Sequence, residues 1–144
     1  MNVTECLINY GKAWFEPDHE RRVDVLRTCC TEDILFVDSN GRAEGLDAVS
    51  KWLGNYIDSM GPGAERTAES EARERGRTGD GVSVDVVTPI EELDGFFRYS
   101  FVWTMPDGST SGGTDFCQVA DDGRMKVITV WPANEAFPLP DAAR

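Results

Sequence analysis

The chain has 144 residues, 40% of them hydrophobic, which is enough to build one domain around one core. Its net charge of −12 argues against nucleic acid or an anionic membrane surface as a partner, because both are bound through basic patches. It has no apolar run of the ~18 residues that span a membrane and no basic-then-apolar leader, so we expect a soluble cytoplasmic protein.

The helices and strands follow from the spacing of apolar residues. A period of three to four residues predicts helices over 2–15, 17–30 and 45–60. Alternation predicts strands over 34–38, 82–87, 96–105, 112–120 and 125–131. Helices first and an antiparallel meander last indicate an α+β domain, a curved sheet with helices on one side.

The stretch 64–81 is rich in Ala, Glu and Arg, with nothing apolar larger than Ala. It is open to reading as an exposed helix, a polar edge strand or a mobile flap. We expect a single domain over 1–133 with a charged, solvated insertion near 62–80 that acts as a lid. The Pro- and Ala-rich tail, 134–144, is expected to be irregular.

Cysteine and histidine offer little to a metal site or a catalytic triad. Cys6, Cys29, Cys30 and Cys117 form no CxxC pair and have no histidine at ligand spacing, so we expect reduced thiols, with Cys29 and Cys30 in a helix. His19 is the single histidine and is expected at the surface in the first turn of a helix. No metal site is predicted, and acid–base chemistry falls to carboxylates, with Tyr or Trp as hydrogen-bond donors.

Two aspartates fall on apolar faces of predicted strands. Asp38 follows Ile34 and Phe36 at a period of two, and it precedes a Ser-Asn-Gly turn. It is therefore either a turn opener or an acid aimed into an apolar pocket. Asp115 shares its face with Cys117, and it is either at a solvent-facing edge or buried and satisfied.

Two carboxyl groups in one apolar cavity do not titrate alike. Burial raises the pKa of each, and a like charge nearby raises it further. One protonated donor and one ionised base then move a proton at neutral pH without histidine. We expect aromatic side chains to form the walls, and the candidate substrate-binding residues are Phe36, Trp52, Tyr56, Phe97, Tyr99 and Phe101.

The order of elements and the motifs "TEDILFVDSNGRAEG" and "GGTDFCQVADDGRMKVITVW" resemble the NTF2-like superfamily, especially its SnoaL-like polyketide cyclase and ketosteroid isomerase-like branches. The resemblance covers nearly the whole chain except 62–80. It implies a cone, with a curved, mainly antiparallel sheet packed on three N-terminal helices. It also implies a mouth for a small hydrophobic molecule and a homodimer through the outer face of the sheet. The superfamily contains enzymes and plain binding modules, so the motifs are more specific for fold than for activity.

The resemblance also implies roles for single residues. Asp38 matches the general base of ketosteroid isomerase, and Asp115 matches the protonated aspartate of its oxyanion hole. An aspartate at the Asp115 position is likewise the acid–base residue of polyketide cyclases of this type. Trp14 stands where the isomerase has a tyrosine, which argues against steroid isomerisation, and Tyr10 is a possible substitute donor. Polyether epoxide hydrolases and pyran-forming cyclases also resemble this fold, and they pair an Asp with a second carboxylate. Glu65 is the candidate for that second acid.

These features predict an isomerase or cyclase that needs no cofactor and acts on a polyketide- or terpenoid-like molecule. In that mechanism ionised Asp38 abstracts or relays a proton. Protonated Asp115, with Trp14 or Tyr10, binds the developing oxyanion. Two alternatives remain open: a non-catalytic small-molecule-binding module, and an epoxide hydrolase or pyran-forming cyclase that uses an Asp/Glu pair.

Overall fold

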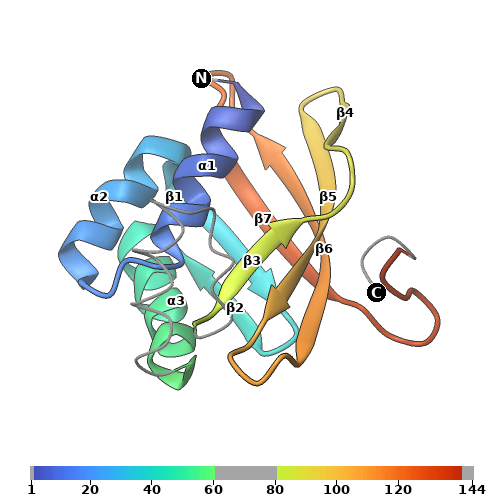
Figure 1. Cartoon of the computed structure of the whole chain (residues 1–144). Coiled ribbons are helices and arrows are strands. Elements are labelled where there is room, and N and C mark those ends of the chain that lie inside the picture. The colour runs from blue at the N-terminus through green and yellow to red at the C-terminus, as the bar shows by residue number, and fades with distance from the viewer. Residues whose placement is uncertain (1, 61–80, 141–144) are drawn as a thin grey trace.

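Three helices and seven strands make up the described part of the chain, residues 2–60 and 81–140 of a computed structural model (Figure 1). The helices are α1 (Val3–Ala13), α2 (His19–Cys29) and α3 (Leu46–Met60). The strands are β1 (Cys30–Asp38), β2 (Gly41–Glu44), β3 (Ser83–Val86), β4 (Glu91–Leu93), β5 (Phe96–Thr104), β6 (Thr110–Val119) and β7 (Met125–Pro132). The predicted insertion and its candidate acid, Glu65, lie outside the described residues.

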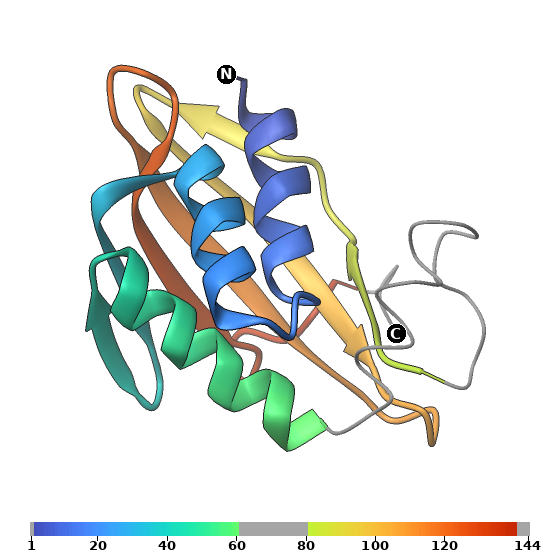
Figure 2. The ribbon, with the colours of Figure 1, turned by 90° about the vertical axis from the view of Figure 1, so that its left-hand side faces the viewer.

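The strands form one mixed sheet in the order β2-β1-β7-β6-β5-β3, with β4 added beside β5. β1 and β7 run parallel, and every other pairing is antiparallel. Figure 2 shows α1 and α2 side by side over one face of the curved sheet, with α3 below them. The predicted α+β cone with three N-terminal helices is therefore confirmed. No helix in the described ranges has both the length and the apolarity that crossing a bilayer requires.

The core lies between the helices and the inner face of the sheet. Alternation along β1 buries Ile34 and Phe36, and alternation along β6 buries Asp115 and Cys117. Helix α3 contributes one apolar face at helical spacing, made of Leu46, Val49, Leu53 and Ile57. The same periods that predicted the elements therefore decide which side chains face inward.

Two short strands, β2 and β4, were not predicted from the sequence. β2 and β4 consist mostly of exposed residues, so neither carries the alternation that marks a half-buried strand. β1 also begins four residues before the predicted strand, because Cys30 pairs with Met125 of β7 and the polar residues that follow it show no apolar alternation. Main-chain pairing sets these boundaries, and the side-chain pattern does not report it.

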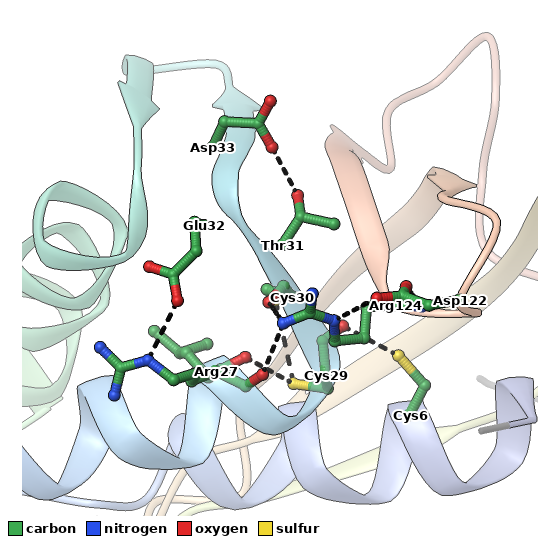
Figure 3. Close-up of polar contacts among 10 residues, drawn as sticks. Cys6, Arg27, Cys29, Cys30, Thr31, Glu32, Asp33, Asp122 and Arg124 are labelled. Carbon is green, nitrogen blue, oxygen red and sulfur yellow. Dashed lines mark hydrogen bonds and ion pairs between the residues drawn. The ribbon is translucent and has the colours of Figure 1, made fainter.

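The junction of α2 and β1 corrects one prediction. Cys29 is the last residue of α2, but Cys30 has an extended backbone, with φ −129° and ψ 147°, and it begins β1. The Cys6 thiol donates a hydrogen bond of 3.1 Å to the carbonyl oxygen of Cys29 (Figure 3). The guanidinium of Arg124 donates to the carbonyl oxygens of Arg27 and Cys30 at 3.3 and 3.4 Å. These donors satisfy carbonyl groups where the helix ends, so the chain turns directly into a strand. All four cysteines are free and buried.

A buried arginine joins α2 to α3. Arg22 donates from Nε to the backbone oxygen and the hydroxyl of Ser50 at 2.9 and 3.0 Å, and from Nη1 to the backbone oxygen of Glu16 at 2.7 Å. His19, partly exposed as the first residue of α2, contacts the same Ser50 hydroxyl at 2.9 Å. A Cβ on Gly54 would lie 2.5 Å from Nη2 of Arg22, so the glycine makes room for the guanidinium. The network fixes α3, which carries part of the site described below.

Replacing Leu26 in α2 tests where the core lies. Leu26 is fully buried, whereas Leu93 in β4 is 78% exposed. We expect Leu26→Ala to lower the free energy of unfolding by about 2–5 kcal/mol, because it leaves a cavity in the core. Leu93→Ala, the matched control, should change it by no more than about 0.5 kcal/mol. Urea denaturation followed by circular dichroism measures both values, and equal losses would contradict the assigned core.

Candidate active site

A cavity of about 420 Å³ lies on the inner side of the sheet and is lined mostly by apolar side chains. α1, β1, α3, β3, β5, β6 and β7 all contribute lining residues. Eight of the predicted site residues line it: Tyr10, Trp14, Phe36, Asp38, Tyr56, Tyr99, Phe101 and Asp115. The tertiary structure thus brings both predicted aspartates and most of the predicted aromatic walls to one cavity.

Two residues that were predicted to form the cavity wall, Trp52 and Phe97, are not among the lining residues. Phe97 is buried in the core, where its ring stacks on Tyr99 with centroids 6.2 Å apart. Trp52 contacts Asp38 through its indole nitrogen and is not among the lining residues. Both therefore support side chains that face the cavity, and neither forms its wall.

Other lining residues were missing from the prediction. Trp103 and Met105 follow Tyr99 and Phe101 at a spacing of two residues, on the side of β5 that faces the cavity. The alternation of β5 could therefore have predicted them as lining residues. Trp103 packs against Trp14, with ring centroids 5.5 Å apart, and Trp14 also lies 5.7 Å from the ring of Tyr56. Trp14 is thus part of an aromatic cluster that joins α1, α3 and β5.

Asp38 opens the turn and also lines the cavity, so both readings of it from the sequence hold. Its Oδ1 accepts a hydrogen bond of 2.8 Å from the backbone N–H of Asn40, which is the contact of a turn-opening aspartate. Its Oδ2 accepts from the indole N–H of Trp52 at 3.0 Å and from the Tyr56 hydroxyl at 2.6 Å. A carboxyl group that only accepts hydrogen bonds has the pattern of an ionised carboxylate.

Asp115 lies in a different environment. Its side chain lines the cavity, yet the residue is only 4% exposed. The hydroxyl of Tyr99, its direct partner across the β5–β6 pair, donates to Oδ2 at 2.5 Å. Within the described residues, no group forms a hydrogen bond with the other oxygen, Oδ1. A buried polar atom without a partner is uncommon in folded proteins.

Burial raises the pKa of Asp115 from 3.8 to about 7, while the hydrogen bond from Tyr99 acts in the opposite direction. The pKa values of Tyr99 and Tyr10 are both raised well above 10.0, first by burial and then by the charge of Asp115. Both phenols therefore remain neutral hydroxyl groups over the physiological pH range, while Asp115 exchanges its proton near neutrality.

The two acids lie in one row across the sheet. Asp115 pairs with Val130 of β7, and Val37 of β1 pairs with Thr129, so Asp38 falls next to Val130 on its other side. Two strand spacings put the Cα atoms of Asp38 and Asp115 about 10 Å apart. The predicted like-charge contribution of Asp38 to the pKa of Asp115 is not found among the described residues, and burial alone raises it.

The described ranges contain no group of three His, Cys, Asp or Glu side chains placed to hold a metal ion. The chemistry that the lining side chains can perform themselves is proton transfer. Asp115 offers a buried carboxyl group whose pKa is raised by burial to about 7, and Asp38 offers a hydrogen-bonded carboxylate in the same cavity.

Solved structures of other proteins share the fold of this chain. No protein-family model and no curated protein sequence matches the chain. Among solved structures, a SnoaL-like family protein from Agrobacterium tumefaciens strain C58 is 20% identical with a TM-score of 0.70, covering 91% of this chain and 97% of that one. An NTF2-like protein from Exiguobacterium sp. 255-15 is 17% identical with a TM-score of 0.59, covering 90% and 98%. One from Mesorhizobium loti is 12% identical with a TM-score of 0.58, covering 91% and 90%.

At these identities, structural similarity establishes the fold and leaves the activity open. The chain therefore has the NTF2-like fold that the resemblance of its sequence motifs implied. A member of the SnoaL-like family has the same fold.

Proposed function

We propose that this protein is an acid–base isomerase or cyclase for a small hydrophobic molecule, such as a polyketide- or terpenoid-like carbonyl compound. The observation that carries the proposal is Asp115, a buried residue that lines an apolar cavity, whose carboxyl group has a pKa of about 7 and one oxygen without a partner among the described residues. A general acid or base is most effective when its pKa lies near the working pH. The similarity to the Agrobacterium protein, described as a candidate isomerase, lends further support.

Protonated Asp115 can donate a hydrogen bond to a ligand carbonyl oxygen. As a proton leaves the adjacent carbon, negative charge develops on that oxygen, and the donor stabilises it more strongly in the transition state than in the ground state. The apolar lining strengthens the effect, because the interaction is not screened by water. Tyr10, whose hydroxyl remains neutral, is placed along the same cavity wall as a second donor.

Asp38 is the proposed acceptor of the proton from carbon. It lines the same cavity about 10 Å from Asp115 across the sheet, so a ligand a few bonds long can lie between the two groups. Its three donors hold the carboxylate in one orientation and leave one lone pair of Oδ1 for a ligand proton. The reaction then uses only acid and base groups of the chain itself.

The binding module remains the second candidate, and the hydrogen bonds of Asp38 favour it. A carboxylate that is held by three protein donors suits a role in orienting a ligand. Both candidates use the same cavity, so proton transfer is the property that separates them. The epoxide hydrolase or pyran-forming cyclase that uses Asp and Glu depends on Glu65, which lies outside the described residues.

Exchange of hydrogen for deuterium tests proton transfer directly. In D₂O, the wild-type protein should accelerate exchange of the protons beside the carbonyl of 2-tetralone, an uncharged ketone, as followed by proton NMR. Asp115→Asn should lose about 100-fold or more of this acceleration, because the amide cannot supply the proton. Asp121→Asn, an exposed aspartate in the turn before β7, is the matched control and should keep the wild-type rate.

Quenching of tryptophan fluorescence reports binding of the same ketone, because Trp14 and Trp103 line the cavity. If 2-tetralone binds to the wild type while exchange stays at the buffer rate, the protein is a binding module and the enzymatic proposal fails.

The stability of Asp115→Asn should depend on pH in a defined direction. The folded protein binds the Asp115 proton more tightly than the unfolded chain does, so ionisation of Asp115 destabilises the fold as pH rises from about 4 to about 7. Asparagine removes this penalty. The free energy of unfolding of the variant, relative to that of the wild type, should rise by up to about 4 kcal/mol between pH 4 and pH 8 in urea denaturation. A difference that is constant with pH would show that Asp115 titrates normally.

We also infer a homodimer that forms through the outer face of the sheet. Phe96, Phe116 and Trp131 are exposed there on adjacent strands β5, β6 and β7, and Phe116 and Trp131 contact each other edge to face. Aromatic side chains exposed together are typical of protein interfaces. Sedimentation velocity should find a dimer for the wild type and a shift toward monomer for Phe116→Ser/Trp131→Ser, with unchanged circular dichroism. A monomeric wild type at tens of micromolar would contradict the inference.

A further inference from the structure

Asp115 belongs to a buried series of contacts that begins outside the cavity. Phe97 stacks on Tyr99 at an interplanar angle of 13°, and both belong to β5. Tyr99 is the direct cross-strand partner of Asp115, and its hydroxyl donates to Oδ2. All three residues are at most 5% exposed. The tyrosine ring therefore has little freedom to turn, and its hydroxyl is fixed against one carboxyl oxygen.

This contact makes the two oxygens of Asp115 unequal. Tyr99 Oη donates its hydrogen to Oδ2, so a proton on Oδ2 would have to share that oxygen with an incoming donor. No hydrogen bond from the described residues reaches Oδ1. The carboxyl proton is therefore better accommodated on Oδ1, the oxygen that has no hydrogen-bond partner among the described residues.

We propose that Tyr99 is a positioning residue, which holds Oδ2 of Asp115 so that the transferable proton is carried by Oδ1. The inference rests on the function proposed above. When Oδ1 gives its proton to the ligand oxygen, the O–H bond breaks, and negative charge spreads over both carboxyl oxygens. The Tyr99 hydrogen bond to Oδ2 then becomes charge-assisted and stabilises the carboxylate until the proton returns.

Titration of Asp115 by carboxyl-carbon NMR tests this role without turnover. Tyr99→Phe removes the donor while retaining the ring that stacks on Phe97. The pKa of Asp115 should rise above the wild-type value by about one to two units, a 10- to 100-fold fall in its acid dissociation constant, because a hydrogen bond to the charged form is lost. Tyr10→Phe also removes one hydroxyl from the cavity wall, but Tyr10 donates no hydrogen bond to Asp115, so this matched variant should leave the pKa near the wild-type value.

The affinity for 2-tetralone supplies a readout that a purely structural role would not move. Binding should weaken as pH rises through the pKa of Asp115, because the Oδ1 proton is lost. In Tyr99→Phe the midpoint of this loss should move to higher pH together with the pKa of Asp115. A uniform loss of affinity at every pH, with an unchanged midpoint, would overturn the proposal.

If Tyr99→Phe does not fold, 3-fluorotyrosine can be incorporated into Tyr10→Phe/Tyr56→Phe, in which Tyr99 is the one tyrosine left. The more acidic phenol should lower the pKa of Asp115 relative to the same protein with ordinary tyrosine. An unchanged pKa in either experiment would overturn the role of Tyr99. A wild-type pKa near 4 would instead remove the basis of the proposed function, so the two failures are distinguishable.

Discussion

Burial of one carboxyl group is the constraint on which the site depends. Asp115 projects from the middle of β6 into an apolar cavity, where water cannot solvate its charge. A carboxylate without compensation is unfavourable in such a place, and the residues that the structure describes supply a single donor, the Tyr99 hydroxyl. One donor is enough to hold the group in place and too little to restore the pKa of an exposed aspartate. The result is a carboxyl group that can gain or lose a proton near neutral pH.

The contrast with Asp38 shows how one fold gives two aspartates different properties. Asp38 lies at the end of β1, where the turn provides a backbone donor and α3 provides Trp52 and Tyr56. These two residues are four apart on α3, so helical geometry points both toward the same carboxylate. Position along the strand, at its end or in its middle, thus determines how many donors each acid receives.

The position of the helices keeps this arrangement in place. Arg22 links α2 to α3 through Ser50, and α3 in turn carries two of the donors that hold Asp38. Trp14 at the end of α1 packs against rings of α3 and β5, so the aromatic lining is continuous from helix to sheet. The guanidinium of Arg124 satisfies carbonyl groups where α2 passes into β1. Each contact joins segments distant in sequence, which is why the cavity is a property of the assembled domain.

The sequence by itself determined the inward faces, and with them the two aspartates, because side chains alternate strictly along a strand and recur every three to four residues along a helix. That was sufficient for an α+β domain with helices on one side of a curved sheet, for the placement of Asp38 and Asp115 beside apolar residues, and for most of the aromatic walls; the cone was implied by the resemblance to the NTF2-like superfamily.

The sequence did not show that the Tyr99 hydroxyl donates a hydrogen bond to Asp115. It also did not show that Trp52 and Phe97 contact lining residues without lining the cavity themselves. Only the tertiary structure decided these points, because strand order and register bring together residues that no local pattern relates. The short exposed strands β2 and β4 were not predicted because backbone pairing with the adjacent strands β1 and β5 forms them without any apolar periodicity.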